Sequence, residues 1–188
     1  ILFILCCAPV ITIGPAVSAL YTITMREARH EGGYIFKPFF KAFKNNFKQA
    51  FLLSILYSII GASFVFGVKF WIEKPEFSTV NQVILVITGV FAVIFIFSLL
   101  YVFALIARFD NTIFKSVKNA VMLAVFNLRE TFLLTLIHVI VIVLMIFTKG
   151  IWIFMMVGGF SVCAYINSLL FIRVFRQYEK IEGGNHDD

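Results

Sequence analysis

The chain has 188 residues, of which 61% are hydrophobic and 14% are charged, and its mean hydropathy is +0.99. Soluble domains are nearer half apolar and a quarter charged, so this composition excludes an ordinary soluble protein and indicates one integral membrane domain over residues 1–188. The net charge of +6 would suit a nucleic-acid-binding protein. However, the enrichment of cytoplasmic loops in Lys and Arg explains that charge, and we expect no nucleic-acid partner.

The first apolar run covers residues 1–25 and is interrupted by Pro9 and by the pair Gly14-Pro15. Proline clashes with the preceding helical turn but is well tolerated at the first position of a helix. The sequence therefore predicts a broken helix: a short piece, an irregular bend from Pro9 to Gly14, and a helix from Pro15. Irregular backbone at membrane depth must be covered, so we expect the bend to pack inside the bundle. Because the chain begins inside this run, we also expect residues before Ile1.

Four further apolar runs cover residues 49–71, 82–107, 131–147 and 151–172. Each meets or approaches the ~20 residues that a helix needs to cross ~30 Å of hydrocarbon. The short connections within the two pairs predict antiparallel hairpins. With the first run, they predict an all-α membrane bundle of about five transmembrane helices. The alternative is four crossings with a re-entrant first segment.

The orientation follows from the basic residues. Thirteen of the sixteen Lys and Arg residues lie in three segments, residues 26–48, 108–129 and 173–180. The positive-inside rule places these three segments in the cytoplasm. We therefore expect a multi-pass protein of the plasma membrane, with its first crossing entered from outside and its C-terminus in the cytoplasm.

Residues 34–48 have the periodicity of an amphipathic helix. The apolar stripe recurs at i, i+4, i+7 and i+11, is broadened by Phe39, and consists of Phe36, Phe40, Phe43 and Phe47. The cationic stripe has the same spacing, one residue along, and consists of Lys37, Lys41, Lys44 and Lys48. Such a helix lies in the membrane interface, where each Lys near an anionic leaflet contributes ~1 kcal/mol. We predict a surface that contacts membrane lipids or a protein partner, and both interpretations stay open.

A weaker copy of this pattern, beginning near Phe114, precedes the apolar run 131–147. The two copies predict a tandem repeat with units at residues 34–110 and 111–182. Three helix ends also share a Ser-x-x-aromatic sequence, at Ser18 to Tyr21, Ser98 to Tyr101 and Ser168 to Phe171. This shared ending favours a parallel repeat.

The sequence carries little that resembles catalytic chemistry. No Asp or Glu lies in the middle of an apolar run, and no P-loop, HExxH or CxxC motif occurs. We expect no enzyme, no catalytic or metal-ligating residue and no cofactor. Intramembrane carboxylates usually carry the proton or cation coupling of transporters, so their absence also disfavours a self-contained secondary transporter.

Two polar residues remain within the apolar runs, His138 and Asn167. They lie on the two arms of one predicted hairpin, at a similar depth of roughly 10 Å. We predict that they form an interhelical polar pair, a hydrogen bond of ~0.6–2 kcal/mol. A ligand-binding or proton-transfer role is the alternative.

Two stretches carry a family resemblance: Cys7-Ala8-Pro9-Val10-Ile11-Thr12-Ile13-Gly14-Pro15-Ala16 followed by Ala19-Leu20-Tyr21, and residues 33–50, GYIFKPFFKAFKNNFKQA. They resemble the YesL-like family of bacterial integral membrane proteins, a domain of unknown function numbered 624. The resemblance implies a protein mainly of Gram-positive bacteria, encoded near carbohydrate ABC importers and glycan-degrading enzymes. It carries over no catalytic residue.

From this resemblance we expect a non-enzymatic accessory or regulatory subunit of an oligosaccharide ABC importer in the bacterial cell membrane. Its partners would be membrane lipids and the permease subunits of the importer. One alternative is a stand-alone channel or carrier, formed as a homo-oligomer. A second alternative is a membrane scaffold or lipid-interacting protein.

Overall fold

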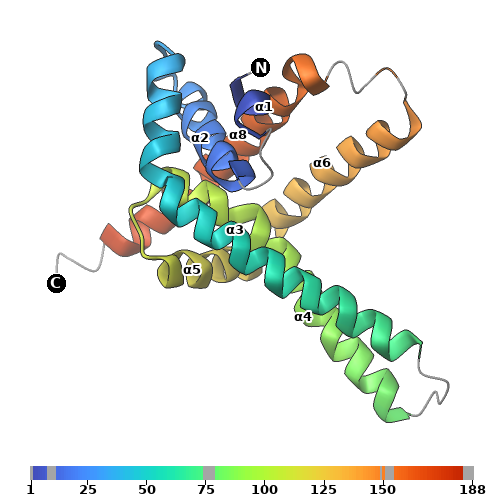
Figure 1. Ribbon diagram of the computed structural model, residues 1–188. Helices are drawn as coiled ribbons and strands as arrows, with labels where there is room; N and C mark the ends of the chain where they lie inside the picture. Colours follow the sequence, from blue (N-terminus) through green and yellow to red (C-terminus); the bar gives the residue numbers. More distant parts are fainter. Residues whose placement is uncertain (1, 8–11, 74–78, 149, 151–154, 184–188) are drawn as a thin grey trace.

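The computed structural model describes residues 2–7, 12–73, 79–148, 150 and 155–183 (Figure 1). These residues form helices and no strand, so the predicted all-α class is confirmed. The helices are α1 (Leu2–Cys7), α2 (Ile13–Ala28), α3 (Phe36–Ile72), α4 (Thr79–Arg108), α5 (Ile113–Phe126), α6 (Leu128–Phe147), a π-helical turn η2 (Met155–Gly159) and α8 (Phe160–Gly183).

Three of the described helices, α3, α4 and α6, are long and apolar enough to cross a membrane, judged by length and composition. They have 37, 30 and 20 residues. The composition and these helices together fit a multi-pass membrane protein. The count of five crossings remains a prediction, because α2 has only 16 residues and the apolar part of α8 begins in the π-helical turn.

The predicted break in the first run is present. Helix α1 ends at Cys7 and α2 begins at Ile13, two residues before the predicted restart at Pro15. Pro9 and the rest of residues 8–11 lie outside the described residues. Across this gap the Thr12 hydroxyl donates a hydrogen bond to the Cys6 carbonyl. Gly14 and Pro15 are buried, whereas Ile13 is 43% exposed, so the described bend packs inside the bundle only at its end.

A Schellman motif ends α2. The amide of Glu31 bonds to the carbonyl of Arg26 at 3.1 Å, and the amide of His30 bonds to the carbonyl of Glu27 at 2.9 Å. His30 has φ +60°, the left-handed conformation that this motif requires. Gly33, with φ +147°, a conformation that favours glycine, follows before α3 begins, so the chain turns between α2 and α3.

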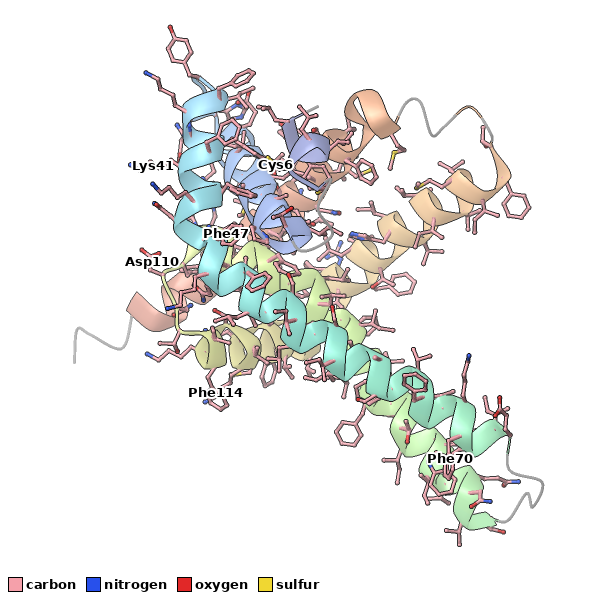
Figure 2. The ribbon with its side chains drawn as sticks, viewed as in Figure 1. Cys6, Lys41, Phe47, Phe70, Asp110 and Phe114 are labelled. Atoms are coloured by element: carbon pink, nitrogen blue, oxygen red, sulfur yellow. The ribbon has the colours of Figure 1, made fainter. Side chains whose placement is uncertain are left out.

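The amphipathic segment and the first long apolar run form one continuous helix, α3, which changes direction near Phe47 (Figure 2). The sequence had suggested a helix lying in the interface, yet residues 44–53 contain no Gly or Pro to stop the helix. In the second copy the chain does break, because Asn127 leaves helical geometry (φ −114°, ψ 56°) between α5 and α6. The two copies therefore differ here, and the tandem repeat remains a prediction.

The core forms where the three Ser-x-x-aromatic helix ends meet. The ring of Phe171 packs edge-on against Tyr21 and Tyr101, with ring centroids 5.3 and 5.5 Å apart. The three serines of the shared ending, Ser18, Ser98 and Ser168, are all buried. Each serine hydroxyl lies in hydrogen-bond distance of a neighbouring side chain. Ser18 is 3.1 Å from Asn46, Ser98 is 3.1 Å from Tyr57, and Ser168 is 2.7 Å from Thr24. The shared ending thus marks the centre of the molecule.

Two apolar arms extend from this core (Figure 1). The buried residues of α3 lie no farther along than Tyr57, and those of α4 begin at Ser98. The remaining halves of α3 and α4 run together as a hairpin whose packing includes the stacked rings of Tyr57 and Phe95, 5.0 Å apart. Helix α6 forms the other arm, since its described buried residues, Thr131 and Leu134, lie near its start.

Candidate functional site

The candidate site is the first four turns of α3, which carry the predicted aromatic and basic stripes. The structure divides the aromatic side chains into a packed and an exposed set. Phe39 is only 2% exposed, whereas Phe36 and Phe40 are 65% and 49% exposed. Phe43 and Phe47 are half-buried and meet edge-on, with ring centroids 5.6 Å apart. The side chains of the predicted aromatic stripe are therefore exposed at the start of α3 and become partly buried towards the core.

The cationic stripe is exposed along its whole length. Lys37, Lys41, Lys44 and Lys48 all lie on the surface. None of them forms a hydrogen bond or ion pair through its side chain within the described residues. The ion pair nearest in sequence joins Arg29 and Glu31, with 3.2 Å between nitrogen and oxygen. The four charges are therefore open to a partner or to lipid headgroups.

Polar side chains on the inner side of α3 fix its position. Asn46 donates to the Ser18 hydroxyl of α2. Gln49 donates to the carbonyl of Asn111 at 2.6 Å and to the Ser116 hydroxyl of α5 at 3.2 Å. Sequence reasoning missed these contacts, because an Asn or Gln within an amphipathic pattern does not indicate which distant element it will meet.

An apolar cavity of about 1010 Å³ lies on one flank of the site, between the start of α3 and helices α1, α2 and α8. Phe36 and Phe39 contribute to its wall. Its few polar groups include those of Thr24, Glu27 and Tyr165. The volume is at the upper end of the ~300–1,000 Å³ typical of small-molecule pockets.

A smaller, mostly polar pocket of about 330 Å³ lies on another flank of α3. Its charged lining residues are Arg26 of α2, Lys41 of α3, Arg108 at the end of α4, and Asp110. Lys41 and Asp110 lie on the same side of the molecule in Figure 2. Sequence reasoning singled out Lys41 only as one of a stripe, and no local pattern links it to Arg26 and Arg108.

The two residues of the predicted polar pair, His138 and Asn167, have other hydrogen-bond partners in the described residues. His138 Nδ1 lies 2.7 Å from the Leu134 carbonyl oxygen, one turn earlier in its own helix. Asn167 is buried, forms a side-chain hydrogen bond with Tyr21, and its Oδ1 has no hydrogen-bond partner. Helix α6 diverges from the first half of α8 (Figure 1), and each side chain has a partner nearer by. The interhelical hydrogen bond remains a prediction.

The described residues contain no group of three or more His, Cys, Asp or Glu side chains placed to hold a metal ion. Cys6, Cys7 and Cys163 are free thiols.

The beginning of the chain matches a known protein family. The model of a family described as "Protein of unknown function, DUF624" matches residues 1–68. That range contains α1, α2 and most of α3, together with both stretches on which the family resemblance rests. No curated protein and no solved structure matches the chain. Its first 68 residues are thus similar to the DUF624 family.

Proposed function

We propose that the chain is a YesL-like member of the DUF624 family and acts as a non-enzymatic accessory or regulatory subunit of a carbohydrate ABC importer. In this proposal it crosses the bacterial plasma membrane five times, with α2 and α8 completing the set begun by α3, α4 and α6. The family match over the first 68 residues and the three long apolar helices support the membership and the membrane location.

The proposed topology has the C-terminus in the cytoplasm. The start of α3, the residues between α4 and α5, and the end of α8 lie on one side of the molecule (left in Figure 1). The ends of α3 and α6 lie on the opposite side. The start of α3 and the end of α8 together carry seven Lys and Arg residues, whereas the end of α3 carries one, Lys69, and the last turns of α6 carry none, so this distribution agrees with the positive-inside rule.

The observation that carries the proposed function is the open face at the start of α3. Two large aromatic side chains, Phe36 and Phe40, remain exposed there beside lysines that form no ion pair within the described residues. Aromatic residues are enriched at the energetic centres of protein interfaces, whereas unpaired charges at the rim guide association. A helix of a permease with an apolar and acidic face would complement this surface.

The arms supply a second surface for a membrane partner. Many large apolar side chains on α4 and α6 are exposed, among them Val86, Phe91, Ile146 and Phe147. These faces contact lipid or another membrane helix. The choice of a carbohydrate importer as partner rests on the resemblance, which implies gene neighbours of that class.

The rival proposal of a stand-alone oligomeric channel or carrier requires a polar path. Apart from Gln82 and Arg129, close to the helix starts, the exposed large side chains that we describe on α4 and α6 are apolar. A path would therefore need polar groups aligned by oligomer symmetry. A lipid-organising scaffold is the second rival, and the exposed apolar and basic surfaces are compatible with it.

The test is affinity purification of the full chain from the native membrane in mild detergent, with and without glycan induction, followed by mass spectrometry. We expect stoichiometric permease subunits with the wild type and their loss with Phe36→Ala/Phe40→Ala. Phe114→Ala is the matched control, because Phe114 is 80% exposed but lies on α5, outside both this face and the arms. A homo-oligomer without permease subunits would contradict the proposal and direct attention to flux measurements in liposomes.

A further inference from the structure

We propose that the polar pocket between α2, α3 and the end of α4 binds the phosphate group of an anionic phospholipid. Its three cations, Arg26, Lys41 and Arg108, come from three different helices and surround one hollow of about 330 Å³. This is a discrete site, in contrast to the diffuse attraction of a leaflet for the whole lysine stripe. The inference is independent of the proposed importer and goes beyond it.

The charges in the pocket favour an anion. Asp110 is the one carboxylate among its described lining residues, which leaves two positive charges in excess. The side chains of Arg26 and Lys41 form no hydrogen bond or ion pair within the described residues. The amide of Asn45 also lines the pocket and adds a neutral hydrogen-bond donor.

The walls of the pocket are held by hydrogen bonds among the three helices. The Thr22 hydroxyl donates to the carbonyl of Ser18 in its own helix at 3.0 Å and approaches that of Ala107 in α4 at 3.4 Å. Asn46 of α3 donates to the hydroxyl of Ser18 at 3.1 Å. Because these contacts tie α2 to both neighbours, the cations are brought together before a ligand arrives, which lowers the entropic cost of binding.

The chemistry of the donors indicates phosphate. Arginine presents a planar fork of N–H groups that matches two phosphate oxygens, and lysine adds a compact positive charge. Basic pockets between membrane helices on the cytoplasmic side suit phospholipid headgroups. Pro38, Ala42 and Ala107 also line the pocket and offer apolar surface for the rest of such a lipid.

The test is native mass spectrometry of the full chain in neutral detergent, titrated with phosphatidylglycerol or, as the uncharged reference, phosphatidylcholine. We expect preferential binding of phosphatidylglycerol. Lys41→Gln and Arg26→Gln should each weaken it about fivefold, since one charge near the headgroup is lost. Asp110→Asn should strengthen it by a similar factor. Lys44→Gln is the matched control, because Lys44 is exposed on the same helix but does not line the pocket.

Glycerol 1-phosphate, added as a competitor, distinguishes the two sources of phosphate. If glycerol 1-phosphate binds much more weakly than phosphatidylglycerol, the site is assigned to a lipid headgroup. If the two bind with equal affinity, the site is assigned to a soluble phosphate ester. Either result supports a phosphate site. Equal loss with Lys44→Gln and Lys41→Gln, or equal binding of phosphatidylcholine, would overturn it, because the attraction would then not depend on the pocket. Circular dichroism spectra of all variants check that the helices are retained.

Discussion

Tyr101 packs edge-on against Phe171, with 5.5 Å between the ring centroids, although the two residues belong to different helices, α4 and α8. Both rings close the same Ser-x-x-aromatic sequence in their helices, and Tyr21 closes the third. The similarity that suggested a duplication therefore also has a structural reason. A small serine lets helices approach closely, and an aromatic ring one turn later fills the space at their meeting point.

The Tyr101 hydroxyl provides the first prediction. It lies 2.9 Å from Thr131 Oγ1, whose own proton is directed to the backbone carbonyls of Ala124 and Asn127. Tyr101 is therefore the donor, and Tyr101→Phe should lower the free energy of unfolding by about 1 kcal/mol. Unfolding in mixed micelles titrated with SDS measures this change. The control Tyr165→Phe, whose hydroxyl makes no hydrogen bond within the described residues, should leave stability unchanged. Equal losses in both variants would contradict the assigned bond.

The sequence predicted the long helices well and their meeting points poorly. A run of apolar residues specifies a spanning helix by its length, so residues 82–107 agree closely with α4 (Thr79–Arg108). It was harder to predict whether an amphipathic segment and the apolar run after it form one helix or two. In the first copy α3 continues through residues 45–50, whereas in the second copy the helix ends at Asn127. No local pattern specified that difference.

The candidate site, too, could be predicted from the sequence only in part. Helical periodicity identified the exposed lysines correctly, since a charged stripe must face water or headgroups. It did not distinguish Phe39, which packs into the protein, from Phe40, which stays exposed. That choice depends on where α2 lies, as does the pocket that joins Lys41 to Arg26 and Arg108. Such contacts between distant parts of the chain leave no periodic signal.

The second prediction concerns Gly14, at the start of α2. A Cβ atom there would clash with Ser54 Oγ and lie 2.8 Å from the Ala50 carbonyl oxygen and 2.9 Å from Phe103 Cε1. Since the Ala50 carbonyl is backbone, α2 and α3 would have to separate, and Gly14→Ala should cost about 1–3 kcal/mol of stability. Gly67→Ala is the control, because nothing lies within 4 Å of its Cβ position. That variant should be neutral or more stable by up to about 1 kcal/mol, owing to the helix propensity of alanine. A destabilising effect of Gly67→Ala alone would refute the packing of α2 on α3.

The third prediction tests whether His138 and Asn167 interact. In the structure they bond to Leu134 and Tyr21 instead. His138→Ala, Asn167→Ala and the double variant should therefore give additive changes in unfolding free energy, to within about 0.5 kcal/mol. A coupling of about 0.6–2 kcal/mol between the two sites would restore the interhelical hydrogen bond expected from the sequence. The double-mutant cycle in mixed micelles decides between these outcomes.

The last prediction separates the two roles of aromatic residues at the start of α3. Phe39 and Phe40 are adjacent and meet edge-on, 5.7 Å between ring centroids, but only Phe39 is buried. Phe39→Ala should therefore cost about 3–5 kcal/mol, because it leaves a cavity between α3 and α2. Phe40→Ala should change stability by less than about 0.5 kcal/mol while lowering recovery of a partner, because an exposed ring contributes to association rather than to folding. Thermal unfolding and quantitative mass spectrometry of the same preparations provide the two measurements. If Phe40→Ala unfolded the protein as strongly as Phe39→Ala, the exposed face would be part of the folded core and could not serve as an interface.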